Sequence, residues 1–396
     1  MKQFFSFSVF FLFAIAISAQ CDGTRFLNQV FDNTVITSDI TYGENLNWDG
    51  STEELSLDVY EPEGDTMDNR PLIIMAHGGS FVGGEKTGED VVPLCHDMAK
   101  MGFVVASIEY RLGTPLTADL EVPMKQAVVR GYHDMKAAIR WFKKDVAEGD
   151  NTYNIDPDKI VLAGVSAGGF ITTHVAYMDD LAEIPAEVDL SLPGLTGGLD
   201  GDSGNPGYTS DVLGVINIAG ALGDTTWMEP GDLPILSLHG TGDNTVPYGQ
   251  DMLTVLGLVD IDTVAGSSVI HERAENLGLT HCFETHFLQG HVPHVSNEAY
   301  YDTTRSFMSN FSTHLVCDIP LECEYRELDL TNSILENSSL EISVYPNPAQ
   351  TYIDLNTDFQ GMSEVMIYDI KGTLVQQGFI NGPSGRVMLD LESGSY

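Results

Sequence analysis

A serine between two glycines follows an apolar stretch in the middle of the chain. Gly164-Val165-Ser166-Ala167-Gly168 comes directly after residues 160–163, which are apolar and predict a buried strand. A helix is expected to begin near Gly168. A Gly-x-Ser-x-Gly turn between a strand and a helix can hold a serine hydroxyl at the tip of a sharp bend, since glycine tolerates backbone contacts that a Cβ would prevent. Ser166 is therefore the candidate nucleophile.

A second glycine-rich segment lies further upstream. Residues 71–76 predict another buried strand, which runs into His77-Gly78-Gly79-Ser80-Phe81. Acyl transfer needs preorganised N–H donors for the negative oxygen of its tetrahedral intermediate. The N–H groups of Gly79 and Ser80, with that of Ala167, are the candidate oxyanion donors. Alone, the segment would equally fit an ordinary glycine-rich turn; beside the serine motif, the catalytic interpretation is favoured.

The candidate acid follows a third apolar strand pattern, at residues 233–238. His239-Gly240-Thr241-Gly242-Asp243 comes next, and Asp243 lies after Ser166 in the chain, as the order Ser, Asp, His requires. The alternative is a solvated turn aspartate, because Gly-Asp-Asn is common in turns. Asp224 and Asp232 are weaker candidates because neither directly follows a strand.

Two histidines could supply the general base. His291 and His294 both follow Asp243, in the loop before an expected last helix. The glycine before His291 suits a tight turn after a strand and favours His291, with His294 as the alternative. His281, Cys282 and His286 lie nearby, but no four ligands stand at a familiar zinc spacing, so no metal is expected.

Four motifs together resemble the α/β-hydrolase superfamily, and within it secreted carboxylesterase- and lipase-like members. They are HGGSF at 77–81, EYRLG at 109–113, GVSAGG at 164–169 and HGTGDNTVP at 239–247. The first and third look like the hormone-sensitive-lipase group. The last looks more like the acid loop of esterases and prolyl-peptidase-like hydrolases. The resemblance covers roughly residues 55–315 and implies a serine hydrolase without a cofactor.

The strand and helix patterns predict the matching α/β architecture. A helix is expected where apolar residues recur every three or four positions from Val128 to Val146, and Arg111 and Asp134 are expected to pair structurally. Strands that alternate with helices imply a mostly parallel sheet covered on both faces. Residues 185–210 are rich in Gly, Pro and Asp and form either a mobile cap over the substrate pocket or a passive surface loop. The expected core strands are 55–60, 72–76, 103–108, 160–165, 214–219, 235–238 and 285–288.

Both ends of the chain have sequences typical of export signals. Residues 1–19 are typical of a secretory signal peptide, followed by the hydrolase domain over 20–317. After a polar linker at 318–338, residues 339–396 predict a small β-sandwich. Its Tyr345-Pro346-Asn347-Pro348 and IYDxxG motifs closely resemble the C-terminal sorting domain of the type IX secretion system of the Bacteroidetes. That family's pattern continues past a Gly-x-Tyr element, so we expect the sequence to be cut short at Tyr396.

Charge and cysteine content narrow the function further. The chain has 58 acidic and 18 basic residues, a formal charge of −40, which excludes nucleic-acid binding and disfavours anionic membranes. The resemblance to a sorting domain implies export through the periplasm and across the outer membrane by the type IX machinery. The five cysteines then lie in an oxidising compartment, where disulfides are permitted and at least one thiol stays unpaired. Cys317 and Cys323 could close a small loop, although the connectivity cannot be deduced.

These observations favour a secreted serine hydrolase of carboxylic esters, on short or medium acyl groups or on acyl decorations of polysaccharides. A serine peptidase of the prolyl-peptidase type would use the same residues on the same fold. From another class, a catalytically inactive surface adhesion or binding protein is the alternative. It is disfavoured because all three triad positions can be filled.

Overall fold

The computed structural model describes residues 21, 23–115, 117, 120–255, 259–326, 343–345, 352–356, 362–368, 374–382 and 384–389. The chain divides into two compact units, Met1–Asn332 and Ser333–Tyr396. The expected signal peptide, residues 327–338 of the expected linker and residues 346–348 of the sorting motif lie outside the described residues.

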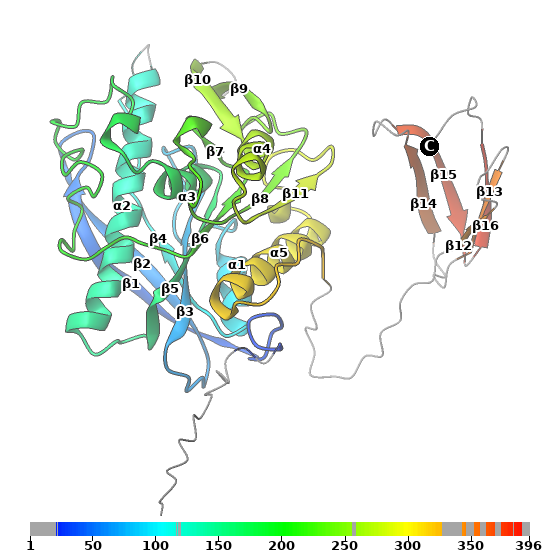
Figure 1. The fold of residues 1–396 in the computed structure, drawn as a ribbon, viewed down its shortest axis with the longest axis horizontal. Coiled ribbons are helices and arrows are strands. Elements are labelled where there is room, and N and C mark those ends of the chain that lie inside the picture. The colour runs from blue at the N-terminus through cyan, green and yellow to red at the C-terminus, as the bar shows by residue number, and fades with distance from the viewer. Residues whose placement is uncertain are drawn as a thin grey trace, which may run out of the picture. The chain divides into compact units, whose positions relative to one another are not determined.

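An eight-stranded sheet forms the centre of the first unit (Figure 1). Its strands pair in the order β1-β2-β4-β3-β5-β6-β8-β11, and all pairs from β4 to β11 are parallel, whereas β1 and β2 are antiparallel to their neighbours. The strands are β1 (Thr34–Leu46), β2 (Thr52–Pro62), β3 (Arg70–Ala76), β4 (Val104–Ile108), β5 (Ile155–Val165), β6 (Gly214–Ile218), β8 (Ile235–Gly240) and β11 (His281–His286).

Helices cover both faces of this sheet, because both faces of its central strands are apolar. Every residue of β3 is buried, and alternate side chains enter opposite cores: Leu72 and Ile74 in one, Ile73 and Met75 in the other. The first core also contains apolar residues of α2 (Glu121–Glu148), α3 (Ala167–Tyr177) and α4 (Ser267–Leu277). The second contains those of α1 (Val92–Lys100) and α5 (Glu298–Cys317). The predicted α/β-hydrolase architecture is therefore confirmed.

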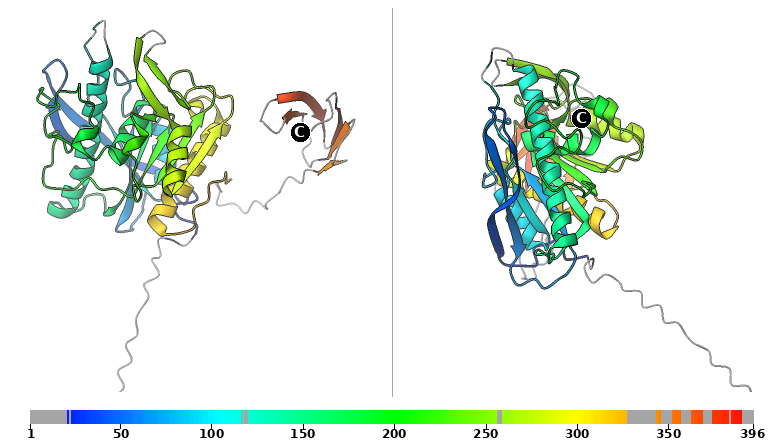
Figure 2. Two further views of the ribbon diagram at one scale, coloured as in Figure 1. Left: turned by 45° about the horizontal axis from the view of Figure 1, so that its top comes forward. Right: turned by 90° about the vertical axis from the view of Figure 1, so that its left-hand side faces the viewer.

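A second, three-stranded sheet was not anticipated from the sequence. Strand β10 (Val259–Gly266) pairs with β7 (Ala221–Leu222) on one side and with β9 (Gln250–Val255) on the other. Figures 1 and 2 show the β9–β10 hairpin and the N-terminal end of α2 at the same end of the first unit. Three short 3₁₀ helices, η1 (Leu181–Glu183), η2 (Thr225–Trp227) and η3 (Pro293–Val295), complete the unit.

The last core strand begins and ends earlier in the chain than predicted. The strand runs over His281–His286 and not over 285–288, and Phe287 and Leu288 lie in the following loop, 48% and 68% exposed. Because β11 is an edge strand, it carries polar residues and lacks the apolar run that marks the central strands. β1 was missed for a related reason, since it is the opposite edge strand and most of its residues are not buried.

The second unit is a small all-β unit. It contains a three-stranded sheet and a two-stranded sheet, and Leu355, Ile380 and Val387 form a common apolar cluster. The strands are β12 (Ser343–Tyr345), β13 (Tyr352–Asn356), β14 (Met362–Tyr368), β15 (Leu374–Asn381) and β16 (Ser384–Met388). Among the described residues, no helix of either unit is long and apolar enough to cross a lipid bilayer.

Two disulfides close the first unit, and neither forms the small loop considered from the sequence. Cys21 is bonded to Cys317 and Cys282 to Cys323, while the thiol of Cys95 is free and buried. The second disulfide holds part of the segment that was expected to be linker. Arg326 adds to this, because its guanidinium donates to Asn28 and Asn310 of the first unit. The described part of the linker region is thus bound to the first unit.

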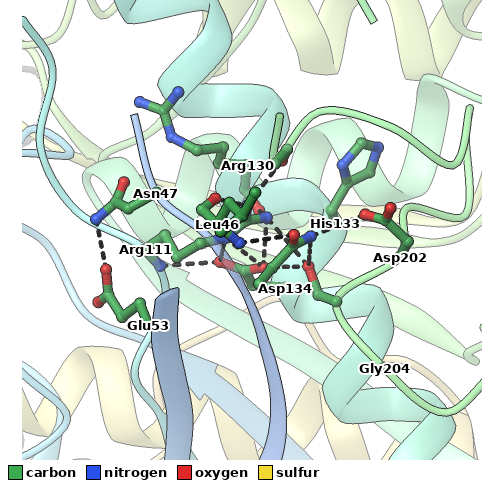
Figure 3. Close-up of polar contacts among 12 residues, drawn as sticks. Leu46, Asn47, Glu53, Arg111, Arg130, His133, Asp134, Asp202 and Gly204 are labelled. Carbon is green, nitrogen blue, oxygen red and sulfur yellow. Dashed lines mark hydrogen bonds and ion pairs between the residues drawn. The ribbon is translucent and has the colours of Figure 1, made fainter. Parts of the chain in front are cut away.

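A buried ion pair joins three distant parts of the first unit (Figure 3). Arg111 follows β4 and Asp134 lies on α2; both side chains are fully buried, and Nη2 lies 2.8 Å from Oδ1. The guanidinium also donates to the carbonyl oxygen of Leu46 at the end of β1 and to that of Gly194 in the 185–210 segment, both at 2.7 Å. Ser203 of the same segment donates to Asp134. The expected structural role of Arg111 and Asp134 is confirmed.

We expect Arg111→Met to reduce the free energy of unfolding by about 3–5 kcal/mol, because the buried charge of Asp134 would lose its partner. The double variant Arg111→Met/Asp134→Leu should be less destabilised than Arg111→Met alone, since it leaves no unpaired charge. Chemical denaturation measures both. Lys100→Met, which removes a partly exposed ion pair with a 3.9 Å separation, is the control and should change stability by no more than about 0.5 kcal/mol. Equal effects of Arg111→Met and Lys100→Met would contradict this.

Candidate active site

Ser166 occupies the sharp turn between β5 and α3. Its backbone has φ 54° and ψ −112°, a conformation that is uncommon for a residue with a side chain. The turn is held by the Ser166 N–H, which donates to the carbonyl oxygen of Ile218 on β6 at 2.8 Å. The two glycines of the motif are needed sterically: a Cβ on Gly164 would collide with the backbone of Gly168, and one on Gly168 with the carbonyl of Ala76. Glycine is therefore required at both positions because β5, α3 and β3 approach one another so closely.

Asp243 lies in the loop after β8, with its carboxylate completely buried. Its Oδ1 accepts hydrogen bonds from the N–H groups of Thr245 and Val246, at 2.8 and 3.0 Å. These bonds fix the carboxylate, so that Oδ2 faces the loop after β11. The weaker candidates have local roles instead: Asp224 caps η2, and Asp232 accepts from the N–H of Glu229.

His291 lies between the aspartate and the serine. Its Nδ1 is 2.6 Å from Asp243 Oδ2, and its Nε2 is 2.8 Å from Ser166 Oγ. An ionised carboxylate only accepts hydrogen bonds, so the proton of the neutral ring lies on Nδ1 and the Nε2 lone pair faces the serine hydroxyl. The structure thus brings together the three residues singled out from the sequence.

The loops that carry Asp243 and His291 are hydrogen-bonded to each other. Gly242 N–H donates to the Gln289 carbonyl at 2.8 Å, and Leu288 N–H donates to Thr241 Oγ1 at 2.8 Å. A Cβ on Gly240 would collide with the carbonyls of Gln289 and Gly290. Gly240 is therefore required for this close approach, which brings the loops of the acid and the base together.

His294, the alternative base, has a different partner. It is 4% exposed, and its Nε2 lies 3.1 Å from the backbone carbonyl oxygen of Asp90. Burial lowers its pKa below the ordinary value, which keeps the ring neutral. His286 is also held neutral, because burial and the neighbouring histidines lower its pKa to about 4. Cys282, which lies near these histidines in the sequence and could have been a metal ligand, forms a disulfide with Cys323.

Hydrogen bonds keep the Asp243 carboxylate charged. Burial alone would raise its pKa, but hydrogen bonds from His239 and His291 more than offset burial, and the pKa lies well below the ordinary value. His239 Nε2 lies 3.2 Å from Oδ2. The carboxylate can therefore stabilise positive charge on either ring.

The glycine-rich loop after β3 passes directly beside the serine. A Cβ on Gly78 would lie 3.3 Å from the Cβ of Ser166, and one on Gly79 would collide with the carbonyl of Gly83. Asp90 fixes the loop by accepting from the Gly78 N–H at 2.7 Å. In the described part of the chain, the N–H groups of Gly79, Ser80 and Ala167 have no hydrogen-bond acceptor. Three free donors thus lie on the segments next to the serine, as the oxyanion interpretation requires.

A cavity of about 540 Å³ opens beside Ser166. Its walls come from the glycine-rich loop, α2, α3, the 181–187 segment, η2 and the β9–β10 hairpin, and they include Phe81, Phe170 and Trp227. The beginning of the 185–210 segment therefore borders the cavity. The hairpin and Trp227 were not predicted to line the cavity. The alternation of Val259 and Ile261 with Asp260 and Asp262 was the available signal for a strand here.

Lys125 joins three of these walls. Its ammonium group pairs with Glu121 of α2, at 2.8 Å, with Glu187, and with Asp262 of β10, at 2.6 Å. The three carboxylate groups lie close enough to share a cation, and Lys125 occupies the centre of the cluster. The cluster therefore connects the cavity walls.

Comparison with known proteins identifies the first unit. A family profile described as BD-FAE matches residues 57–197. Two structures of an esterase from Thermogutta terrifontis share the fold: the propionate-bound form has a TM-score of 0.51 at 20% identity and covers 70% of this chain and 94% of that one. The form phosphoramylated by tabun has a TM-score of 0.50 at 20% identity, with coverages of 71% and 95%.

The first unit is a carboxylesterase-like α/β-hydrolase. It is similar to carboxylesterase 3B of Mus musculus, 34% identical over 129 residues, which are 32% of this chain and 21% of that protein. It is also similar to carboxylesterase NlhH of Mycobacterium tuberculosis, 30% identical over 166 residues, 39% of this chain and 47% of that protein. The chain thus spans less than half the length of these curated relatives.

The second unit has its own family. A profile described as a secretion system C-terminal sorting domain matches residues 343–396. This type IX sorting domain implies export of the α/β-hydrolase to the cell surface or beyond it.

The lowered pKa of Asp243 predicts a pH-dependent contribution to stability. A depressed folded-state pKa stabilises the fold above the ordinary aspartate pKa of about 4, and this contribution is lost as the pH falls through the folded-state value. We therefore expect the difference in unfolding free energy between the wild type and Asp243→Asn to shrink as the pH falls from 7 towards about 3. Asp150→Asn, at an exposed position, is the control for chemical denaturation at each pH. A difference that does not vary with pH would contradict the expectation.

Proposed function

We propose that this α/β-hydrolase is a secreted serine carboxylic-ester hydrolase. The observation that carries the proposal is the row of Asp243 Oδ2, His291 and Ser166 Oγ, with separations of 2.6 and 2.8 Å, beside the three free N–H donors. This arrangement can both generate a nucleophile and stabilise a negative oxygen.

In the first half of the reaction, Ser166 Oγ bonds to the ester carbonyl carbon while His291 Nε2 takes the hydroxyl proton. The carbonyl π-electrons move to the oxygen, which is stabilised by the N–H groups of Gly79, Ser80 and Ala167. The C–O bond to the alcohol then breaks, and His291 returns the proton to the leaving oxygen. Asp243 stabilises the transient imidazolium through its 2.6 Å hydrogen bond.

In the second half, water replaces the alcohol. His291 takes a proton from the water, whose oxygen bonds to the acyl carbon. The bond between the acyl carbon and Ser166 Oγ then breaks, and His291 gives the proton to Oγ. The products are the carboxylic acid and the free enzyme. Apart from water and the ester, every group used belongs to this chain, so the proposed mechanism needs no cofactor.

The cavity supports substrates of limited size. Its volume of about 540 Å³ is in the range of pockets for small ligands, and its lining combines aromatic and aliphatic side chains with many polar ones. Short or medium acyl groups fit this description, including acyl decorations on polysaccharides that a secreted enzyme would meet.

The two disulfides support export to an oxidising compartment. Residues 1–19 would direct the chain to the periplasm, and the sorting domain would engage the type IX machinery for passage across the outer membrane. Cys21, which follows the expected cleavage site, has its sulfur in the disulfide to Cys317 and is therefore not free to carry a lipid.

We expect Ser166→Ala to lower kcat on a 4-nitrophenyl ester by roughly 10⁴-fold or more while the fold is kept. A fluorophosphonate probe should label the wild type and not this variant. His291→Ala should be as severe as Ser166→Ala, because triad members act as a unit, and His294→Ala is the matched control that should retain far more activity.

Each alternative function gives a different result. A wild type that is folded but neither labelled nor active would indicate an inactive binding protein. Labelling with cleavage of a proline-containing peptide, and no turnover of esters, would indicate a peptidase. Either result would overturn the proposal.

We expect a chain that ends at Asn332 to keep the kcat and KM of the longer chain on a soluble ester. All proposed catalytic residues and both disulfides lie in the first unit. In the native host, the shortened chain should accumulate in the periplasm, as measured by cell fractionation. A folded but inactive shortened chain would show that the sorting domain belongs to the catalytic unit.

A further inference from the structure

His174 lines the cavity and takes no part in the proposed triad. It lies on α3, eight residues after Ser166, and is 6% exposed. At 1.5 Å per residue, the two Cα atoms are about 12 Å apart along the helix axis. Phe170 lies between them on the same side of the helix, so the cavity follows α3 from the nucleophile to this histidine.

The hydrogen bonding of His174 fixes its tautomer. Nδ1 lies 2.7 Å from the carbonyl oxygen of Phe170, and a carbonyl only accepts, so Nδ1 carries the proton. Burial lowers the pKa of the ring to about 4, which keeps it neutral at pH 7. Nε2 therefore presents a lone pair, and no donor among the described residues reaches it.

Neighbouring residues hold the ring and leave space beside Nε2. Trp227 meets the His174 ring edge-on, with centroids 5.5 Å apart, and the Phe170 ring stacks at 6.2 Å. A Cβ on Gly223 would lie 3.4 Å from Nε2, in contact with it. Glycine at this position thus leaves the acceptor open to the cavity.

The cavity begins at the serine and at two of the candidate oxyanion donors. The leaving oxygen must come within hydrogen-bond reach of His291 Nε2, which protonates it. His291 is not among the described residues that line the cavity, whereas Ser80, Ser166 and Ala167 are. An acyl chain attached to the carbonyl carbon can therefore enter the cavity from the serine.

We propose that His174 is a specificity-determining residue whose Nε2 accepts a hydrogen bond from a hydroxyl group at the far end of the acyl chain. The substrate class is accordingly esters of hydroxy acids, with the hydroxyl about two helical turns from the carbonyl. This inference rests on the proposed ester hydrolysis and deepens it. In the wall of the cavity, an acceptor without a partner disfavours a purely apolar chain end and favours a donor.

Matched pairs of soluble methyl esters test this on the full chain. Each pair consists of the methyl ester of an ω-hydroxyalkanoate and that of the alkanoate in which a methyl group replaces the hydroxyl. Release of the acid is measured by titration at constant pH. The ratio of kcat/KM within a pair should fall by about tenfold in His174→Phe, which keeps a ring but removes the acceptor. The fall should be largest for acyl chains of roughly six to eight carbons, which span the distance to His174.

Two further variants separate hydrogen bonding from structure. His174→Gln retains an acceptor and should keep more of the ratio than His174→Phe. His271→Phe removes another buried, neutral histidine, on α4 and outside this cavity, and should leave the ratio unchanged. Activity on the methyl-terminated esters should persist in all three variants.

The results that would overturn the role of His174 differ from the result that would overturn ester hydrolysis. Equal ratios in the wild type and in His174→Phe, at every chain length and with activity intact, would overturn the role of His174. A ratio that falls equally in His271→Phe would also overturn it, because the effect would then be structural. A wild type that hydrolyses no ester and is not labelled at Ser166 would instead overturn the proposed ester hydrolysis.

Discussion

The burial of the Arg111 guanidinium constrains distant parts of the first unit at once. A buried cation must have its donors satisfied, and here the acceptors come from the end of β1, from α2 and from the 185–210 segment (Figure 3). Because the partners are far apart in the chain, the pair requires these three parts to be in place together. α2 also forms a wall of the cavity, so the same ion pair helps to fix the position of that wall.

The catalytic geometry rests on a second constraint, the carboxyl edge of the parallel sheet. β8 and β11 are neighbours in the sheet, and β6 separates β5 from β8. The loops after β5, β8 and β11 carry Ser166, Asp243 and His291. The side chains meet only because glycines allow backbones to touch where the loops cross, as at Gly168 and Gly240. The strain at Ser166 is held by hydrogen bonds and packing on both sides of the turn.

Chemistry and specificity come from different parts of this fold. The proposed triad and oxyanion donors lie on loops anchored in the central sheet, while the cavity walls include the β9–β10 hairpin and the 181–187 segment outside it. Lys125 joins these outer walls through Glu187 and Asp262. A change in these outer elements can alter which acyl group fits while the row from Asp243 to Ser166 stays intact.

The sequence by itself determined the α/β architecture, the central strands, the long amphipathic helix and the residues from which the site is built. Buried parallel strands and glycine-rich turns leave local patterns, which is why Ser166, Asp243 and the loop at 77–81 could be found. The edge strands β1 and β11 and the β9–β10 hairpin lack a continuous apolar run, so their bounds were missed or displaced. The sequence only favoured His291 over His294, and the tertiary structure placed His291 between Asp243 and Ser166. The tertiary structure alone paired Cys21 with Cys317 and pointed the free nitrogen of His174 into the cavity, because each depends on contacts between segments distant in the chain.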